Sequence, residues 1–340
     1  MRKAGLALVV ALALPATASA QTPPAPTPTP PPPAATPVPT PAPPATPATL
    51  STSTIDTFDK TPAAFVGRSF SARVVMKPFI AGETAIIRVY RGGPTHPKKI
   101  QVKTLKFTAV NGGAAGVATI KVKSGKAGSL AIKVSHKATA TVPTARAKTV
   151  RVNVVNMSAG FGSRGPAVRY LQSKLASLHY VTSTGGLYDA ATGRAVMAFR
   201  KLTGMTRVET ANDQVFKALL AGRGQFKVRH PGDGHHVEAR LNQQVLALID
   251  GNKVQRIYTT SSGKPSTPTV RGKFRVYMKT PGTNAKGMVD SSYFIRGYAI
   301  HGYSSVPPYN ASHGCLRVPV PNARAIYDWL RMGDVVWVEA

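Results

Sequence analysis

The stretch AIHGYSSVPPYNASHGCLRVP, residues 299 to 319, holds the only cysteine of the chain, Cys315, and two histidines, His301 and His313. A cysteine attacks as its thiolate, but an unperturbed thiol pKa of about 8.5 leaves only a small fraction ionised at neutral pH. A neighbouring imidazole can take the thiol proton and later return it to a leaving amine. The spacing therefore favours a nucleophilic cysteine, and it leaves a buried inert cysteine or a Cys-His-His zinc site as alternatives.

Strand patterns surround this stretch and predict a mostly β domain over residues 237–340. Residues 246–258 predict a hairpin, because the Gly251-Asn252 pair at their centre favours a tight turn. Residues 271–277 predict a further strand, and residues 322–332 predict a peripheral helix. With a single cysteine, the chain can form neither an intrachain disulfide nor a multi-cysteine zinc site.

The motifs of this domain resemble those of the L,D-transpeptidases of the YkuD type. The strings that carry the resemblance are Gly297-Tyr-Ala-Ile-His-Gly, Ser312-His-Gly-Cys-Leu-Arg and, upstream, Ser262-Gly263, Thr267-Pro268 and Gly272-Lys-Phe-Arg-Val. The segment between Pro268 and Gly272 is longer than the usual Thr-Pro-x-Gly turn, a departure that concerns the local turn and not the chemistry. The resemblance covers residues 237–339 and favours the nucleophile over the two alternatives.

The resemblance implies a role for each residue at the centre of the motif. Cys315 would be the nucleophile, and His301 would be the base that activates it. The backbone carbonyl of Gly302 would orient His301, in the place that a carboxylate takes in other triads. The backbone N–H groups of Gly314 and Cys315 would hold the oxyanion of the tetrahedral intermediate.

The resemblance also implies roles for the residues around the nucleophile. Ser312 and His313 would brace the loop, and His313, the nearer histidine in sequence, stays open as an acid or as an alternative base. Arg317 would bind a substrate carboxylate through its planar fork; the alternative is a surface arginine at a strand end. Residues 280–294 would form a lid, with Tyr293 facing the substrate peptide.

The reaction that the resemblance implies begins with attack of Cys315 on the carbonyl between the third residue of a peptidoglycan stem peptide and its terminal D-Ala. D-Ala leaves, and an amine of a second stem peptide then opens the thioester to form a 3→3 cross-link. Water in place of the amine would make the protein an L,D-carboxypeptidase. No metal and no organic cofactor is required. A non-catalytic wall-binding protein is the other alternative, although a binder has no need of a thiol accompanied by two histidines.

A second region, residues 160–224, predicts a small three-helix domain. Its apolar residues recur at a period near 3.6, as in Val168, Leu171 and Leu175, and Asp189 and Thr210 are predicted helix N-caps. The region resembles the peptidoglycan-binding three-helix module. The matching positions are Gly165, Val168, Leu171, Gln172, Leu175, Leu178, Tyr180, Gly186, Thr192, Val196, Phe199 and Gly204. Arg200 stands where that family usually has Gln.

A third region, residues 51–156, predicts an immunoglobulin-like β-sandwich. Six or seven short runs alternate apolar and polar residues between Gly, Pro and Asn turns. Residues 51–155 hold 18 Lys and Arg against three acidic residues, a formal charge of +15. We interpret this surface either as a solvated spacer or as a face that binds anionic wall polymers.

The amino terminus predicts export. Residues 1–20 read as a cleavable signal peptide: two basic residues, an apolar run and Ala18-Ser19-Ala20. Residues 21–50 hold 14 prolines and no charged residue, which predicts a stiff polyproline II linker. We therefore expect a secreted protein of the bacterial cell wall or periplasm, with peptidoglycan as its partner and no integral membrane segment after cleavage.

The whole chain carries a formal charge of +31, from 44 Lys and Arg against 13 Asp and Glu. Such a charge attracts polyanionic partners. Nucleic acid is disfavoured as the partner, because only 7% of the residues are aromatic, no recognition motif is present and residues 1–20 are predicted to direct export. Residues 225–236 include HPGDGHH, which we interpret as a hinge between domains; a metal cluster is the alternative.

Overall fold

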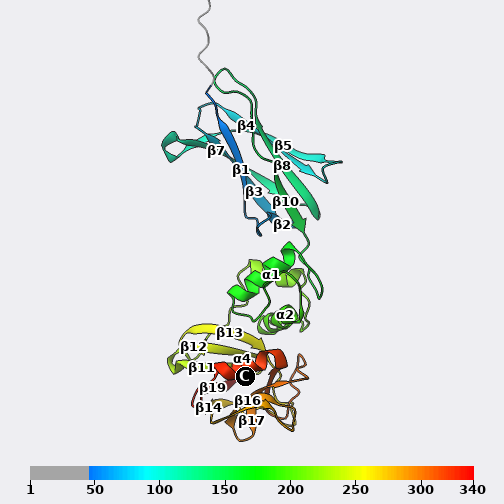
Figure 1. Ribbon diagram of the computed structural model, residues 1–340, viewed down its shortest axis with the longest axis vertical. Helices are drawn as coiled ribbons and strands as arrows, with labels where there is room; N and C mark the ends of the chain where they lie inside the picture. Colours follow the sequence, from blue (N-terminus) through cyan, green and yellow to red (C-terminus); the bar gives the residue numbers. More distant parts are fainter. Residues whose placement is uncertain (1–45) are drawn as a thin grey trace, which may run out of the picture. The chain divides into compact units, whose positions relative to one another are not determined.

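The computed structural model describes residues 46–340. The predicted signal peptide (1–20) and nearly all of the predicted linker (21–50) lie outside the described residues. The chain is mostly β and multidomain, as predicted, with a sandwich, a group of three helices and a second β region in chain order (Figure 1). No helix within residues 46–340 is long and apolar enough to cross a membrane.

The amino-terminal region is a sandwich of two sheets. The first sheet has the order β1 (Thr49–Ile55), β3 (Ser69–Lys77), β7 (Ala115–Lys123), β6 (Thr108–Val110). The second has the order β2 (Ala63–Phe65), β10 (Val150–Val155), β8 (Gly128–His136), β4 (Thr84–Arg91), β5 (Lys98–Lys106), with β9 (Ala145–Arg146) beside β8. If the strands are lettered in chain order, the first sheet has the order A-B-E-D and the second contains G-F-C, as in an immunoglobulin sandwich. The predicted fold class is therefore confirmed.

The period-two alternation of the sequence builds this sandwich. In β3, every second residue from Phe70 to Met76 is buried, while Arg73 and Lys77 are exposed. Ile87, Leu130 and Ile132 from the second sheet complete the core and are fully buried. The outward positions are therefore free to carry the lysines that give this region its charge.

Three helices follow: α1 (Pro166–Ser177), α2 (Ala190–Leu202) and α3 (Asp213–Leu220). Asp189 caps α2, because its carboxylate accepts the N–H of Thr192 at 2.9 Å, as predicted. The predicted cap at Thr210 is wrong: Asn212 caps α3 through the N–H of Val215. Arg200 is buried and donates hydrogen bonds to Thr210 and Asn212, so its role at the family's Gln position is structural.

The carboxy-terminal region packs two sheets and one helix around a single core. The first sheet has the order β13 (Lys253–Thr259), β12 (Val245–Asp250), β11 (His235–Arg240), β19 (Val335–Glu339), β14 (Gly272–Arg275). The second has the order β15 (Met278–Thr283), β16 (Val289–Ile295), β17 (Tyr298–Tyr303), β18 (Leu316–Pro319), with α4 (Val320–Trp329) against it. Leu246, Leu248, Phe294, Leu316 and Ile326 join the sheets and the helix in that core.

The predicted hinge at residues 225–236 differs from the structure at its end. His235 and His236 begin β11, and His236 is fully buried. Burial opposes ionisation of Glu238, but hydrogen bonds from His236, Arg240 and the backbone lower the pKa of this carboxyl to about 2. The HPGDGHH segment therefore ends in an ordered strand. The buried Glu238 keeps its charge there because its hydrogen bonds replace the water that burial removes.

Candidate active site

The pairing of two strands decides which side chains surround Cys315. β17 and β18 are parallel, with Ile300 opposite Leu316 and His301 opposite Arg317. Directly paired residues point to the same face of a sheet, and side chains alternate along each strand. Cys315 stands one residue before β18, so it lies on the same face as His301 and Arg317. Residues fourteen positions apart in the chain thus become diagonal neighbours.

His301 is held in one orientation. It is 3% exposed, and its Nδ1–H donates to the carbonyl oxygen of Gly302 at 2.9 Å. The carbonyl can only accept, so the neutral ring carries its proton on Nδ1 and leaves Nε2 free as an acceptor. Burial lowers the pKa of His301, with the positive charge of Arg317 acting in the same direction and the Gly302 hydrogen bond against it. The imidazole is therefore a neutral base at pH 7.

The thiol of Cys315 is partly buried, and its Sγ lies 3.7 Å from the carbonyl oxygen of Gly297. Burial raises the pKa of Cys315, while the backbone of Ala299 and the charges of Arg317 and Lys286 lower it to a smaller extent. The resting site therefore holds a neutral thiol and a neutral imidazole. A base that takes the proton during attack suits this state, because little thiolate is present beforehand.

The loop before Cys315 is fastened by Ser312, which is 1% exposed. Its Oγ donates to the carbonyl oxygen of Cys315 at 2.6 Å and accepts the N–H of Gly314 at 3.0 Å. Its own N–H donates to Ser262 O, and its carbonyl accepts from the N–H of Lys264. The N–H of Gly314, which the sequence predicts to hold the oxyanion, donates to Ser312 in this structure.

Gly314 has a local reason to be glycine. Its φ is +119°, and a Cβ at this position would lie 2.4 Å from the ring of Tyr298. A side chain here would meet both backbone strain and a collision. Tyr298 was missed as a site residue, although its place in the Gly297-Tyr298 motif was a signal that could have found it.

Tyr303 is a second residue that the sequence did not single out. Its ring lies edge-on to His301, with centroids 5.7 Å apart, and the guanidinium of Arg317 lies 4.1 Å from the centre of the same ring. A cation over an aromatic face is attracted by its quadrupole. Tyr303 therefore positions Arg317 and forms one wall beside His301.

The other predicted residues fall around this group. Tyr293 lies on β16 directly opposite Ala299, which places it on the face that carries Cys315. The predicted lid at 280–294 is largely two paired strands, β15 and β16, with a turn between them. His313 is exposed. The structure thus brings Cys315, His301, Arg317 and Tyr293 to one face and leaves His313 outside that row.

Two cationic side chains of the helical region donate hydrogen bonds to the carboxy-terminal region. Lys201 of α2 is 2% exposed, and its Nζ donates to Thr259 Oγ1 at 2.7 Å and to Thr260 O at 2.8 Å. Thr260 Oγ1 in turn donates to Arg317 O at 2.7 Å. Arg207 donates to Pro308 O at 2.9 Å. The helices therefore support both β18 and the segment that leads to Ser312.

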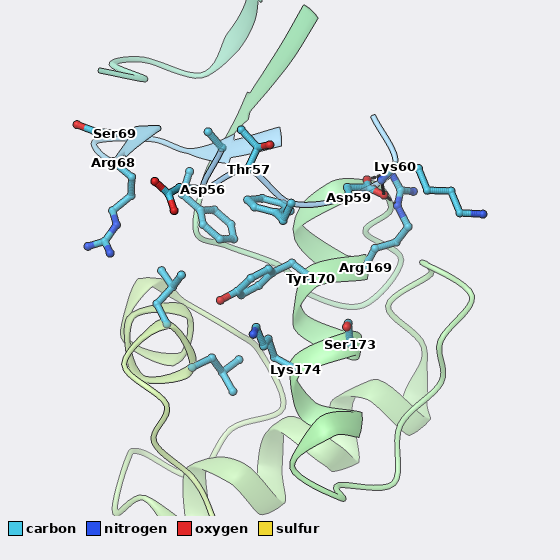
Figure 2. A pocket seen from close by; sticks show the side chains of 15 residues that line it. Asp56, Thr57, Asp59, Lys60, Arg68, Ser69, Arg169, Tyr170, Ser173 and Lys174 are labelled. Carbon is cyan, nitrogen blue, oxygen red and sulfur yellow. Dashed lines mark hydrogen bonds and ion pairs between the residues drawn. The ribbon is translucent and has the colours of Figure 1, made fainter. Parts of the chain in front are cut away.

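A separate cavity of about 750 Å³ lies away from Cys315 and is lined by residues of the sandwich and of the helical region. Figure 2 shows Tyr170 of α1 pointing across it, with Lys174 nearby and the ion pair of Asp59 with Arg169 at one side. Phe65 packs edge-on against the Tyr170 ring at 5.0 Å. Aromatic packing of this kind supports the contact between the two regions.

The YkuD family, the L,D-transpeptidase catalytic domain, matches residues 234–338. A solved L,D-transpeptidase from Xylanimonas cellulosilytica DSM 15894 is 34% identical to the chain, with 54% of this chain and 98% of that chain covered and a TM-score of 0.49. The chain contains a YkuD-type L,D-transpeptidase catalytic domain at residues 234–338.

Two other solved structures are also similar to part of the chain. The catalytic domain of the E. faecium L,D-transpeptidase is 25% identical, over 31% of this chain and 97% of that chain, with a TM-score of 0.27. L,D-transpeptidase 1 of Mycobacterium tuberculosis is 24% identical, over 32% of this chain and 63% of that chain, with a TM-score of 0.26. No curated protein matches the chain. The predicted YkuD-type catalytic domain is confirmed, and the peptidoglycan-binding role of the helices stays a prediction.

Proposed function

We propose that this L,D-transpeptidase is an exported cell-wall enzyme in which Cys315 is the nucleophile and His301 its base. The observation that supports this assignment is the placement of both side chains on one face of β17 and β18, with the imidazole tied to Gly302 O. That tie leaves Nε2 of His301 unprotonated on the ring. A base needs this state, and the exposed His313 has no comparable constraint.

In the first half-reaction, Cys315 Sγ gives its proton to His301 Nε2 and bonds to the carbonyl carbon of the third stem residue. The bond from that carbon to the D-Ala nitrogen breaks, and His301 returns the proton to the departing amine. The N–H of Cys315 would stabilise the oxyanion, a contribution of roughly 3 to 4 kcal/mol for one donor. Ser312 would hold the loop in shape by engaging Gly314 and the Cys315 carbonyl.

In the second half-reaction, a side-chain amine of another stem peptide attacks the thioester. His301 takes a proton from the attacking nitrogen, the C–S bond breaks, and the thiolate of Cys315 recovers the proton. The product is a 3→3 cross-link. Water in place of the amine gives the second candidate, L,D-carboxypeptidase trimming, by the same proton transfers.

The remaining assignments concern substrate and place. Arg317 would bind a carboxylate of the stem peptide, and Tyr293 would contact the peptide from the neighbouring strand. Export would follow from the signal peptide predicted at residues 1–20, and the basic sandwich, at +15 over residues 51–155, would bind anionic wall polymers. The protein would then work in the bacterial wall or periplasm.

Two measurements test the proposal. Intact-mass analysis after incubation with a carbapenem should show one adduct on the wild type and none on Cys315→Ala, with Ser305→Ala as a matched surface control. Muropeptide analysis of cell wall treated with the protein should show new 3→3 dimers with release of D-Ala. An adduct that survives Cys315→Ala would refute the nucleophile, and shortened peptides without dimers would favour the carboxypeptidase. If neither an adduct nor a product forms, the remaining candidate is a non-catalytic wall-binding protein.

A further inference from the structure

The face that carries Cys315 continues beyond His301 into a second hollow. Along the parallel ladder, His301 is followed on its face by Tyr303, and Arg317 is followed by Pro319. Tyr303 and Pro319 both line a cavity of about 550 Å³. At about 3.3 Å per residue, the four steps from Cys315 to Pro319 span about 13 Å, which is the length of an extended tetrapeptide.

The helical region supplies the opposite wall of this cavity. Ala190, Arg194 and Met197 line it at a helical spacing from α2, and Glu209 lines it beside them. The hydrogen bonds of Lys201 and Arg207 with the catalytic strands and loop hold this wall in place. The cavity is therefore built from both regions and requires their contact.

Arg194 is the side chain of this lining with a buried polar atom that lacks a partner. Its Nε is buried and makes no hydrogen bond, and among residues 46–340 no ion pair joins its guanidinium to Glu209 or to another carboxylate. A buried guanidinium N–H without an acceptor is costly, and the planar fork of arginine matches a carboxylate. Glu209 can accept N–H groups of a peptide or an ammonium. The cavity therefore suits a peptide that carries both charges.

We propose that this cavity binds the acceptor stem peptide, with Arg194 recognising its carboxylate. The inference rests on the proposed function. The acceptor's amine must give a proton to His301, and His301 lies between Cys315 and Tyr303 on the ladder. A peptide that enters along Tyr303 therefore brings its amine to the base while the acyl group occupies Cys315. Arg194 is a specificity residue for the second half-reaction.

The test separates the two half-reactions of the full-length protein. The donor is a stem tetrapeptide, and the acceptors are a stem tripeptide with a free terminal carboxylate and the same tripeptide as its carboxamide. Arg194→Gln should raise the KM for the carboxylate acceptor about tenfold or more, the range that a lost charged hydrogen bond gives. It should also abolish the preference over the carboxamide. The rates of carbapenem acylation and of D-Ala release without acceptor should stay within twofold of wild type.

The controls keep the outcomes distinct. Arg194→Lys should keep part of the preference, because it retains the charge without the fork, and Arg223→Gln, at an exposed arginine of the same region, should keep all of it. An unchanged acceptor KM in Arg194→Gln would overturn the proposal. So would an equal fall in acylation, since it would assign Arg194 to the donor. Failure of the proposed function is a different result, in which the wild type itself neither acylates nor releases D-Ala.

Discussion

The two histidines beside Cys315 come from regions of different construction. β17, which carries His301, is paired on both edges, with β16 and with β18, and the ring is buried. Residues 304–314 contain no strand and are held by contacts from Ser262 and Arg207, and His313 on this segment is exposed. Strand pairing on both edges fixes the position of His301, and its hydrogen bond to Gly302 O fixes which ring nitrogen carries the proton. A loop held by a few polar contacts fixes the shape of the backbone but leaves an exposed side chain free.

The strongest test of this difference is removal of each histidine. His301→Ala should slow acylation by a carbapenem by about 10² to 10⁴ at pH 7, the range for loss of a general base. His313→Ala should slow it by less than about tenfold, because that side chain contributes through the loop at most. Stopped-flow or mass-resolved acylation rates measure both, with circular dichroism to check folding. If His313→Ala slows acylation more than His301→Ala does, His313 is the base and His301 is not.

The pH dependence sharpens the same comparison. Burial lowers the pKa of His301 and raises that of Cys315. The unprotonated base is therefore already present at pH 7, and the thiolate does not form unaided until higher pH. Wild-type acylation should be nearly constant from pH 7 to about 8.5, whereas His301→Ala should gain about tenfold per pH unit in that range. A flat profile in His301→Ala would mean that another group takes the thiol proton.

The shape of the loop before Cys315 depends on Ser312. Ser312→Ala removes the hydrogen bonds to Cys315 O and from Gly314 N, so the backbone before Cys315 loses its internal tie. Acylation should fall roughly tenfold to a hundredfold, as expected for about 1–3 kcal/mol from unsatisfied buried groups. The profile against pH should keep its wild-type shape, because His301 is untouched. A changed shape would show that the loop sets the protonation state of the site; Ser305→Ala is the matched control.

Lys201 supports β18 through Thr260, and its titration gives a stability test. Burial lowers the pKa of Lys201 to about 7. Above pH 7 the unfolded chain keeps a proton that the folded chain has released, so the free energy of unfolding should rise with pH until the ordinary lysine range near 10. The rise from this group is at most about 1.4 kcal/mol per pH unit. Denaturant unfolding from pH 7 to 9 should show this rise in wild type and lose it in Lys201→Met.

The exposed Lys217, which pairs with Asp213, provides the control for that measurement. Lys217→Met should keep the wild-type dependence on pH, because a surface ion pair contributes little. Equal slopes for wild type and Lys201→Met would contradict a depressed pKa at the buried amine.

The smallest effect on catalysis should come from the sandwich, which carries neither histidine. Lys98, Lys99 and Lys103 are exposed on β5, and their joint change to Gln removes three charges. Retention on purified sacculi should weaken, and its steep dependence on salt should become shallower, since exposed charges are screened over about 8–10 Å. Acylation rates should be unchanged. Equal retention of both proteins at every salt concentration would assign the sandwich a spacer role.

Several features of this protein could be predicted from local sequence. Alternation at period two predicted six of the sandwich strands, and the Gly251-Asn252 pair predicted the hairpin of β12 and β13. Period 3.6 predicted the helices. These patterns succeed because neighbouring residues alone determine which face of a strand or helix is apolar. The Ser312 to Arg317 motif likewise indicated the family, because its residues are adjacent in the chain.

Short elements and caps were the local features that failed. β1, β2, β6 and β9 were not predicted, and the cap of α3 is Asn212 rather than Thr210. β2, β6 and β9 have three residues or fewer, too few alternations to show a period, whereas β1 (Thr49–Ile55) consists mainly of Thr and Ser. Two polar residues near a helix start are equally good caps by type. Residues 280–294, predicted as a lid, form strands that pair with each other and with β17, and this pairing could not be predicted from their own sequence. Their role as a lid stays a prediction.

Sequence by itself determined the residue types at the centre of the site: one cysteine, two histidines and the glycines around them. Tertiary structure decided which of them meet. The parallel register of β17 and β18 places His301, and not His313, beside Cys315. Folding also turned the N–H of Gly314 toward Ser312 and brought Lys201 and Arg194 from α2 to the catalytic strands. Register and interdomain contacts depend on packing between distant segments, and no local period encodes that packing.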